Sequence, residues 1–138
     1  MPPLDPEIES LISQWIAKAD ADLEVARRIS PEASDNPRIR EIVGFHCQQV
    51  AEKYLKALLT RYQIEFPKTH DIKMLIQLAS SGGSPVADSL ADASWLTPFG
   101  LKIRYPGETA EMQPGDEVRA IEIASQVKQV VLAILNAA

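Results

Sequence analysis

The chain has 138 residues, a net charge of −5 at pH 7 and one cysteine. This length suits a single domain, residues 1–138, with one hydrophobic core. The negative charge argues against a protein that coats nucleic acid nonspecifically, because such binding needs many cationic contacts to phosphates. The sequence has neither an apolar run of about 18 residues nor a secretory signal pattern. A lone cysteine cannot form a disulfide within the chain, so we expect a cytoplasmic protein.

The first helix is predicted from residue 6 to about residue 30. Asp5 is an N-cap candidate, Pro6 suits the first turn, and Glu7 lies near the positive end of the helix dipole. Apolar residues then recur at steps of three and four, which indicates one apolar face. They are Ile8, Leu11, Ile12, Trp15, Ile16, Ala19, Leu23, Ala26 and Ile29.

Four further helical segments follow at residues 37–62, 71–79, 86–96 and 116–136. The second helix has Val43, Val50, Tyr54, Leu55 and Leu58 on its core side. Pro98 and Gly100 suggest a break after the fourth segment, and an extension of that helix beyond the break stays open. Glycine and proline mark residues 80–85 and 104–115 as loops. Alternating strand patterns are absent. The sequence therefore predicts an all-α, up-and-down bundle of four to five helices.

Polar side chains gather along one side of the second predicted helix. At roughly 100° per residue, one stripe holds His46, Gln49, Lys53 and Lys56, with Glu52 at its edge. Two interpretations stay open. The stripe is a solvated face with a Glu52–Lys56 pair that contributes about 0.2–0.5 kcal/mol. Alternatively, it lines a groove for an anionic or nucleotide-like ligand, in which lysines supply charge and His46 and Gln49 supply directional hydrogen bonds.

His70 stands just before the short helix and also has two interpretations. In the first, Thr69 or Asp71 caps that helix, and His70 packs on a neighbouring helix or donates to a backbone carbonyl. In the second, His70 lies near His46 at the mouth of the groove. The spacing of the two histidines matches no known ligand pattern, so we predict no metal site and no cofactor. Cys47 is expected to pack as a small hydrophobic residue.

Arg104 and Tyr105 precede Pro106 at a predicted helix end. In one interpretation Pro106 stops the helix, Tyr105 closes the edge of the core and Arg104 pairs with a carboxylate. In the other, the guanidinium fork of Arg104 binds a phosphate. The two tryptophans, Trp15 and Trp95, are expected in the core or a dimer interface rather than as stacking platforms.

Residues 45–59 read FHCQQVAEKYLKALL, and THDI at 69–72 and RYPG at 104–107 follow in order. This pattern resembles the HEPN domain, the higher-eukaryote and prokaryote nucleotide-binding family, over nearly the whole chain. The resemblance implies a small up-and-down helical bundle that is usually homodimeric. It also implies a link to nucleotide or RNA metabolism and toxin–antitoxin pairs. Such proteins are often encoded beside a minimal nucleotidyltransferase.

Many HEPN proteins are metal-independent ribonucleases that use an arginine and a histidine separated by four to six residues, late in the domain. Here no histidine occupies positions 109–111 after Arg104, and none follows Arg119. A formal match exists earlier, at Arg40 and His46. A step of six residues turns roughly 120° around a helix, so these two side chains are not expected to share a face.

We therefore expect a non-catalytic HEPN-type domain that binds nucleotide or RNA, or serves as the partner subunit of a minimal nucleotidyltransferase. Two alternatives are a ribonuclease toxin of the same fold with an atypical site, and a purely structural dimerisation module. No catalytic residue is assigned. The candidate ligand-binding residues are His46, Gln49, Glu52, Lys53, Lys56, His70, Arg104 and Tyr105.

Overall fold

The computed structural model describes residues 3–100 and 112–137, and these residues form helices, turns and loops without a strand. The all-α prediction is therefore confirmed. The helices are α1 (Pro6–Ile29), the 3-10 helix η1 (Ser30–Glu32), α2 (Pro37–Arg61), α3 (Ile72–Ser81), the 3-10 helix η2 (Ala91–Gly100) and α4 (Asp116–Ala137). None of them, in the described part of the chain, is long and apolar enough to cross a membrane.

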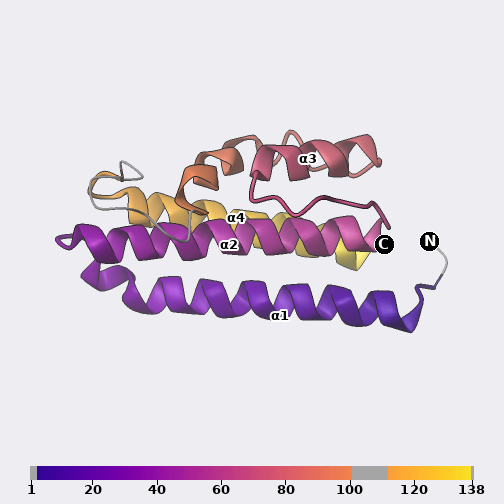
Figure 1. Ribbon diagram of the computed structural model, residues 1–138, viewed down its shortest axis with the longest axis horizontal. Coiled ribbons are helices and arrows are strands. Elements are labelled where there is room, and N and C mark those ends of the chain that lie inside the picture. Colours follow the sequence, from indigo (N-terminus) through magenta and orange to yellow (C-terminus); the bar gives the residue numbers. More distant parts are fainter. Residues whose placement is uncertain (1–2, 101–111, 138) are drawn as a thin grey trace.

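The second helix is the centre of the bundle. The long helices α1, α2 and α4 lie alongside one another, with α1 running opposite to the other two (Figure 1). Helices α3 and η2 form a shorter layer on the side of α2 away from α1. Because α1, α3, η2 and α4 all pack on α2, this helix is covered on more sides than an amphipathic surface helix would be.

Side-chain caps set the beginnings of three helices. Asp5 Oδ1 accepts a hydrogen bond from the backbone N–H of Glu7 at 2.8 Å, as predicted for α1. Asn36 caps α2, and Asp71 Oδ1 accepts from the Met74 N–H at 3.3 Å at the start of α3. These acceptors satisfy N–H groups that have no partner within the helix.

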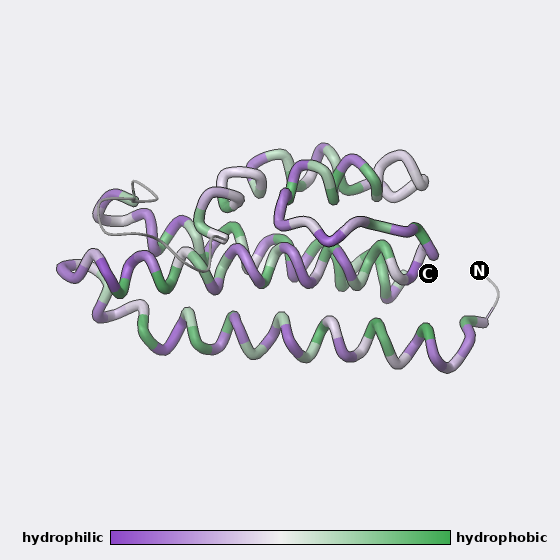
Figure 2. The backbone as a smooth tube through the Cα atoms, in the orientation of Figure 1, coloured by the Kyte–Doolittle hydropathy of each residue, from purple (hydrophilic) through white to green (hydrophobic). Residues whose placement is uncertain are grey.

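The core forms where α1 and α4 meet α2. The five predicted core residues of α2 are all buried, and so is Cys47. Hydrophobic residues recur turn after turn along α1 (Figure 2). Fewer residues of α1 are buried than the predicted apolar face contains. The buried ones are Ile12, Ala19, Leu23 and Ala26. Leu11 was expected on this face but is 48% exposed, because it lies about 100° around the helix from Ile12.

The predicted fourth helix, residues 86–96, is wrong in type and in position. Residues 85–90 form turns, and η2 begins only at Ala91. It continues through Pro98 to Gly100, as the alternative of an extended helix allowed. From residue 90 onward the buried apolar side chains of this segment are Leu90, Ala93, Leu96 and Phe99. Their spacing of three residues is the period of a 3-10 helix, in which side chains at i and i+3 lie one above the other.

Candidate functional site

The polar side chains of α2 form two rows rather than the single predicted stripe. Gln48, Glu52 and Lys56 follow one another at steps of four, which places them on one face. That face is covered by residues 62–71 and by η2. His46 and Lys53 lie instead on the side that faces α1, where both contact Asp22. The predicted residues are therefore divided between two sites.

The first site, here called the Glu52 cluster, consists of Gln48, Glu52, Lys56 and His70. Oε1 of Glu52 lies 2.6 Å from Nδ1 of His70 and accepts from Nε2 of Gln48 at 3.1 Å. Oε2 of Glu52 lies 3.1 Å from Nζ of Lys56. The side chains of Glu52 and Lys56 are only 5% and 9% exposed. The predicted Glu52–Lys56 pair therefore forms, but it is buried rather than solvated, because residues 62–71 fold over it.

Gln48 connects this cluster to two neighbouring segments. Its Nε2 also donates to the backbone carbonyl of His70 at 3.0 Å, and its Oε1 accepts from Nε2 of Gln49 at 2.7 Å. The backbone of Gly100 packs directly on the Gln48 side chain, since a Cβ atom at position 100 would lie 2.5 Å from Gln48 Cδ. Gln48 thus fixes both the backbone at His70 and the end of η2.

Aromatic rings cover the ammonium group of Lys56. Its Nζ lies 5.5 Å from the centroid of the Trp15 ring and 5.7 Å from that of Phe66. The two rings meet edge to face, with centroids 6.4 Å apart and planes at 61°. Both distances are within the range of a cation–π interaction. Lys56 is therefore held by a carboxylate on one side and by two rings on the other.

The second site, here called the Asp22 cluster, consists of Asp22, His46 and Lys53. Nδ1 of His46 lies 2.8 Å from Asp22 Oδ1, and Lys53 Nζ lies 2.6 Å from Oδ2. Burial of Asp22 opposes its ionisation, but the hydrogen bonds from His46 and Lys53 outweigh it, so the pKa of Asp22 lies below its usual value. The cluster links α1 to α2 through a charged carboxylate.

A neighbouring carboxylate, Asp20, extends the polar contacts to α4. Asp20 accepts hydrogen bonds from the hydroxyl of Tyr54 and from Lys128 Nζ, the latter at 3.0 Å. Burial and the Asp20 carboxylate raise the pKa of the Tyr54 hydroxyl above its ordinary value. This phenol therefore stays a neutral donor through the physiological range.

The two histidines occupy different clusters, so the proposed meeting of His46 and His70 at one groove does not occur. Asp71 caps α3, as the other interpretation predicted. His70 contacts the carboxylate of Glu52, and its side chain is 68% exposed. Arg104 and Tyr105 lie outside the described residues.

Arg40 and His46 do not form a pair either. Arg40 is buried, donates from Nη2 to the carbonyl of Ser34 at 2.7 Å, and has its Nε 3.6 Å from Glu117 Oε1. His46 faces Asp22 on α1 instead. The prediction that these two side chains do not share a face is confirmed.

Two members of these clusters, Asp22 and Gln48, and the neighbouring Asp20 were not among the predicted site residues. The four-residue spacing of Gln48, Glu52 and Lys56 is visible in the sequence and could have indicated a ladder of contacts along one face. The two aspartates carry no comparable signal, because their partners lie on other helices.

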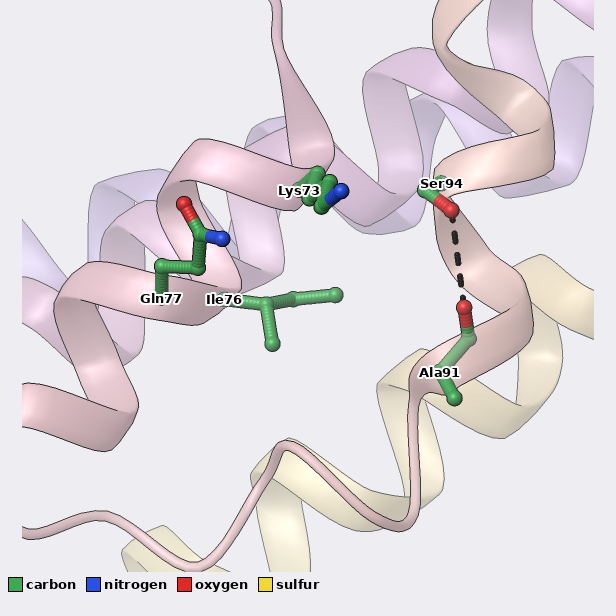
Figure 3. A pocket seen from close by; sticks show the side chains of 5 residues that line it. All are labelled: Lys73, Ile76, Gln77, Ala91 and Ser94. Carbon is green, nitrogen blue, oxygen red and sulfur yellow. Dashed lines mark hydrogen bonds between the residues drawn. The ribbon is translucent and has the colours of Figure 1, made fainter.

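Two pockets lie away from both clusters. One, of about 350 Å³, lies between α3 and η2 and is lined by Lys73, Ile76, Gln77, Ala91 and Ser94 (Figure 3). The other, of about 300 Å³, is lined by Leu4, Glu9, Ile12, Ser13, Arg61 and Leu135. Neither includes a predicted ligand-binding residue. In the described ranges, no group of three or more His, Cys, Asp or Glu residues is placed to hold a metal ion.

These features define an all-helical bundle whose central helix carries a buried Gln–Glu–Lys row. Comparison with known families matches residues 12–135 to the HEPN domain, and the chain therefore belongs to the HEPN domain family. No curated protein and no solved structure matches it.

Proposed function

We propose that this HEPN domain binds nucleotide or RNA without cleaving it. We further propose that it acts as a homodimer and as the partner of a minimal nucleotidyltransferase in a toxin–antitoxin-like pair. Membership of the family supports a nucleotide- or RNA-related function. The more specific assignment depends on the contacts of the chain's two histidines.

The observation that carries the proposal is that each histidine is paired with a carboxylate. His46 contacts Asp22 and His70 contacts Glu52, and these pairs belong to separate clusters. The only arginine that stands at a suitable spacing before a histidine, Arg40, is buried beside Glu117. An arginine and a histidine acting together on one phosphodiester would need to face a common point. This arrangement argues against cleavage by an Arg40–His46 pair, and family membership supports nucleotide or RNA binding.

His70 is the residue of the two clusters best placed to touch a ligand. Glu52 holds its Nδ1, which fixes the orientation of the ring, while most of the side chain is exposed. A fixed imidazole with an exposed second nitrogen can hydrogen-bond a base, a ribose hydroxyl or a phosphate. Lys53 and Lys56 are ion-paired with Asp22 and Glu52, so their charges are compensated inside the protein rather than offered to a ligand.

The test is binding of AMP, ATP and a short single-stranded RNA to the purified protein, measured by calorimetry. The His70→Ala variant is expected to weaken the binding that the wild type shows. His46→Ala is the matched control, since it also removes an imidazole held by a carboxylate but belongs to the other cluster. Absence of binding of all three ligands to the wild-type protein would overturn the proposal.

The partner is tested separately. The neighbouring genes are first searched for a minimal nucleotidyltransferase, and the chain is then co-expressed with that protein carrying an affinity tag. Stoichiometric co-purification is expected. If the two proteins elute separately at micromolar concentration, or if no such gene neighbours this one, the partnership is refuted while nucleotide binding stands or falls on its own measurement.

A second candidate function, ribonuclease activity at an atypical site, has one observation in its favour. The Glu52–His70 contact resembles the carboxylate–imidazole pairs that orient a general base. If this pair is catalytic, purified protein degrades RNA in the presence of EDTA, and His70→Ala abolishes the activity. If the wild type leaves RNA intact, this candidate is excluded.

A further inference from the structure

We infer that Trp15 and Phe66 form a stacking platform for an unpaired nucleobase, with the Lys56 ammonium beneath it. This inference rests on the proposed function and deepens it, because it names the base-binding part of the site. It also reassigns Trp15, which the sequence favours as a core or interface residue. Three observations support it: both rings are partly exposed, the ammonium of Lys56 lies close to both rings, and His70 shares the Glu52 carboxylate with Lys56.

The two rings belong to different segments that meet at the surface. Trp15 comes from α1 and Phe66 from residues 62–71, and both side chains are partly exposed. Their edge-to-face contact, with centroids 6.4 Å apart, holds the two rings at fixed angles to each other. Partly exposed aromatic rings are the common means by which proteins bind single-stranded nucleic acid, because every base has a π face.

The position of Lys56 gives the rings an inner and an outer side. Its Nζ lies 5.5 Å and 5.7 Å from the two ring centroids, and its side chain is only 9% exposed. The ammonium is more buried than the rings that cover it, so we take the face of each ring opposite Lys56 as the outer face. A cation on one side of an aromatic ring draws electron density toward itself. The outer side becomes more attractive to an electron-rich purine.

His70 lies next to this platform through a shared carboxylate. Glu52 contacts His70 Nδ1 with Oε1 and Lys56 Nζ with Oε2. The exposed imidazole is thus connected to the Lys56 ammonium through one carboxylate, and we assign to it the ribose or phosphate of the stacked nucleotide. Stacking on one base requires little positive surface, so it is compatible with the net charge of −5.

Trp95 supplies a matched control in the same chain. It also meets a phenylalanine edge to face, Phe99 at 5.0 Å between centroids. Its ring, however, is covered by the guanidinium of Arg119, 4.3 Å from the centroid. Trp95 therefore has the same aromatic chemistry as Trp15, but the exposed side chain of Arg119 lies over its ring and occupies the place that a base would take.

The experiment measures binding of a fluorescein-labelled single-stranded RNA octamer of adenosines, and of AMP, to the whole chain. Trp15→Leu and Phe66→Leu keep apolar bulk and remove the aromatic face. Each is expected to weaken binding by about 5-fold or more, the effect of losing one stacked base. Trp95→Leu is expected to stay within about twofold of the wild type, which is less than the effect of losing one stacked base. Circular dichroism establishes that each variant is folded.

The outcomes separate this inference from the proposed function. If the wild type binds but Trp15→Leu and Phe66→Leu bind equally well, the platform is refuted and nucleotide binding remains. If the wild type binds neither probe, both ideas fail. Aromatic-dependent binding of AMP assigns the platform to a free nucleotide. Aromatic-dependent binding of the octamer alone assigns it to single-stranded RNA.

Discussion

Nδ1 of His70 lies 2.6 Å from Oε1 of Glu52, a carboxylate that is almost completely buried within the second helix. Through this contact, and through the hydrogen bond from Gln48 to the carbonyl of His70, residues 62–71 are attached to α2. The motif that carries the family resemblance thus acts inside the protein. It positions an exposed imidazole rather than presenting its own lysines to solvent.

Replacing Glu52 by Gln is expected to destabilise the protein strongly. The change removes the charge that compensates Lys56, which stays buried. Breaking a buried ion pair on one side typically costs about 3–5 kcal/mol. Urea unfolding measures the loss, and Glu65→Gln is the control because Glu65 is an exposed acid in the segment that covers the cluster. Equal stability of the two variants would show that the buried pair has no such role.

Gly100→Ala is expected to disturb the same cluster from the other side. The new Cβ would lie 2.5 Å from Cδ of Gln48, so either η2 or the Gln48 side chain must move. Overpacking of this kind costs about 1–3 kcal/mol. In a Gln48→Ala background the clash is absent, so the loss caused by Gly100→Ala should shrink. A loss that is the same in both backgrounds contradicts the packing described for Gly100.

The Asp22 cluster predicts a specific response to acid. The pKa of Asp22 in the folded protein lies below the ordinary value of 3.8, so the unfolded chain binds a proton first as the pH falls. The stability from this group is fully present above pH 3.8 and is lost as the pH drops through the folded pKa. Asp22→Asn should therefore lose less stability than the wild type below that pH. Urea unfolding at several acidic pH values checks this, and parallel losses would refute it.

Cys47 is predicted to be chemically inert in the folded state. Burial raises the pKa of its thiol from 9.0 to about 12, so the reactive thiolate is scarce at pH 8. Ellman's reagent should react slowly with the native protein and rapidly in urea. Since the folded pKa is raised, stability from this group also declines as the pH rises above 9.0. A native thiol that reacts at the unfolded rate contradicts the burial of Cys47.

Local sequence signals predicted the long helices well. Asp5 and Pro6 mark the start of α1, and the apolar spacing in α2 identified residues that are all buried. Such signals succeed because caps and amphipathic periods depend on neighbouring residues in the chain. The wrong helix type at η2 also comes from a local signal. Leu90, Ala93 and Leu96 are spaced by three residues, and this spacing fits one face of an α-helix as well as of a 3-10 helix.

The candidate site was harder to predict because burial depends on distant segments. The polar residues of α2 indicate a solvated face only if nothing covers them, and the sequence does not show that residues 62–71 fold over Glu52 and Lys56. Asp22 pairs with His46 and Lys53, but it lies on α1. The sequence pattern of that helix indicates only its apolar face. Long-range polar partners of this kind leave no periodic signal.

Amide hydrogen exchange tests most directly whether the Glu52 cluster holds residues 62–71, including His70, in place on α2. The experiment compares wild type, Glu52→Gln and, as the control from the Asp22 cluster, Lys53→Met. We predict that Glu52→Gln accelerates exchange at the amides of Asp71 and Ile72, which donate to Thr69 and Thr97, while the amides of α1 lose protection only to the extent that global stability falls. Lys53→Met should leave Asp71 and Ile72 unchanged. If the amides of Asp71 and Ile72 keep their protection in Glu52→Gln, the Glu52 cluster does not hold residues 62–71 in place.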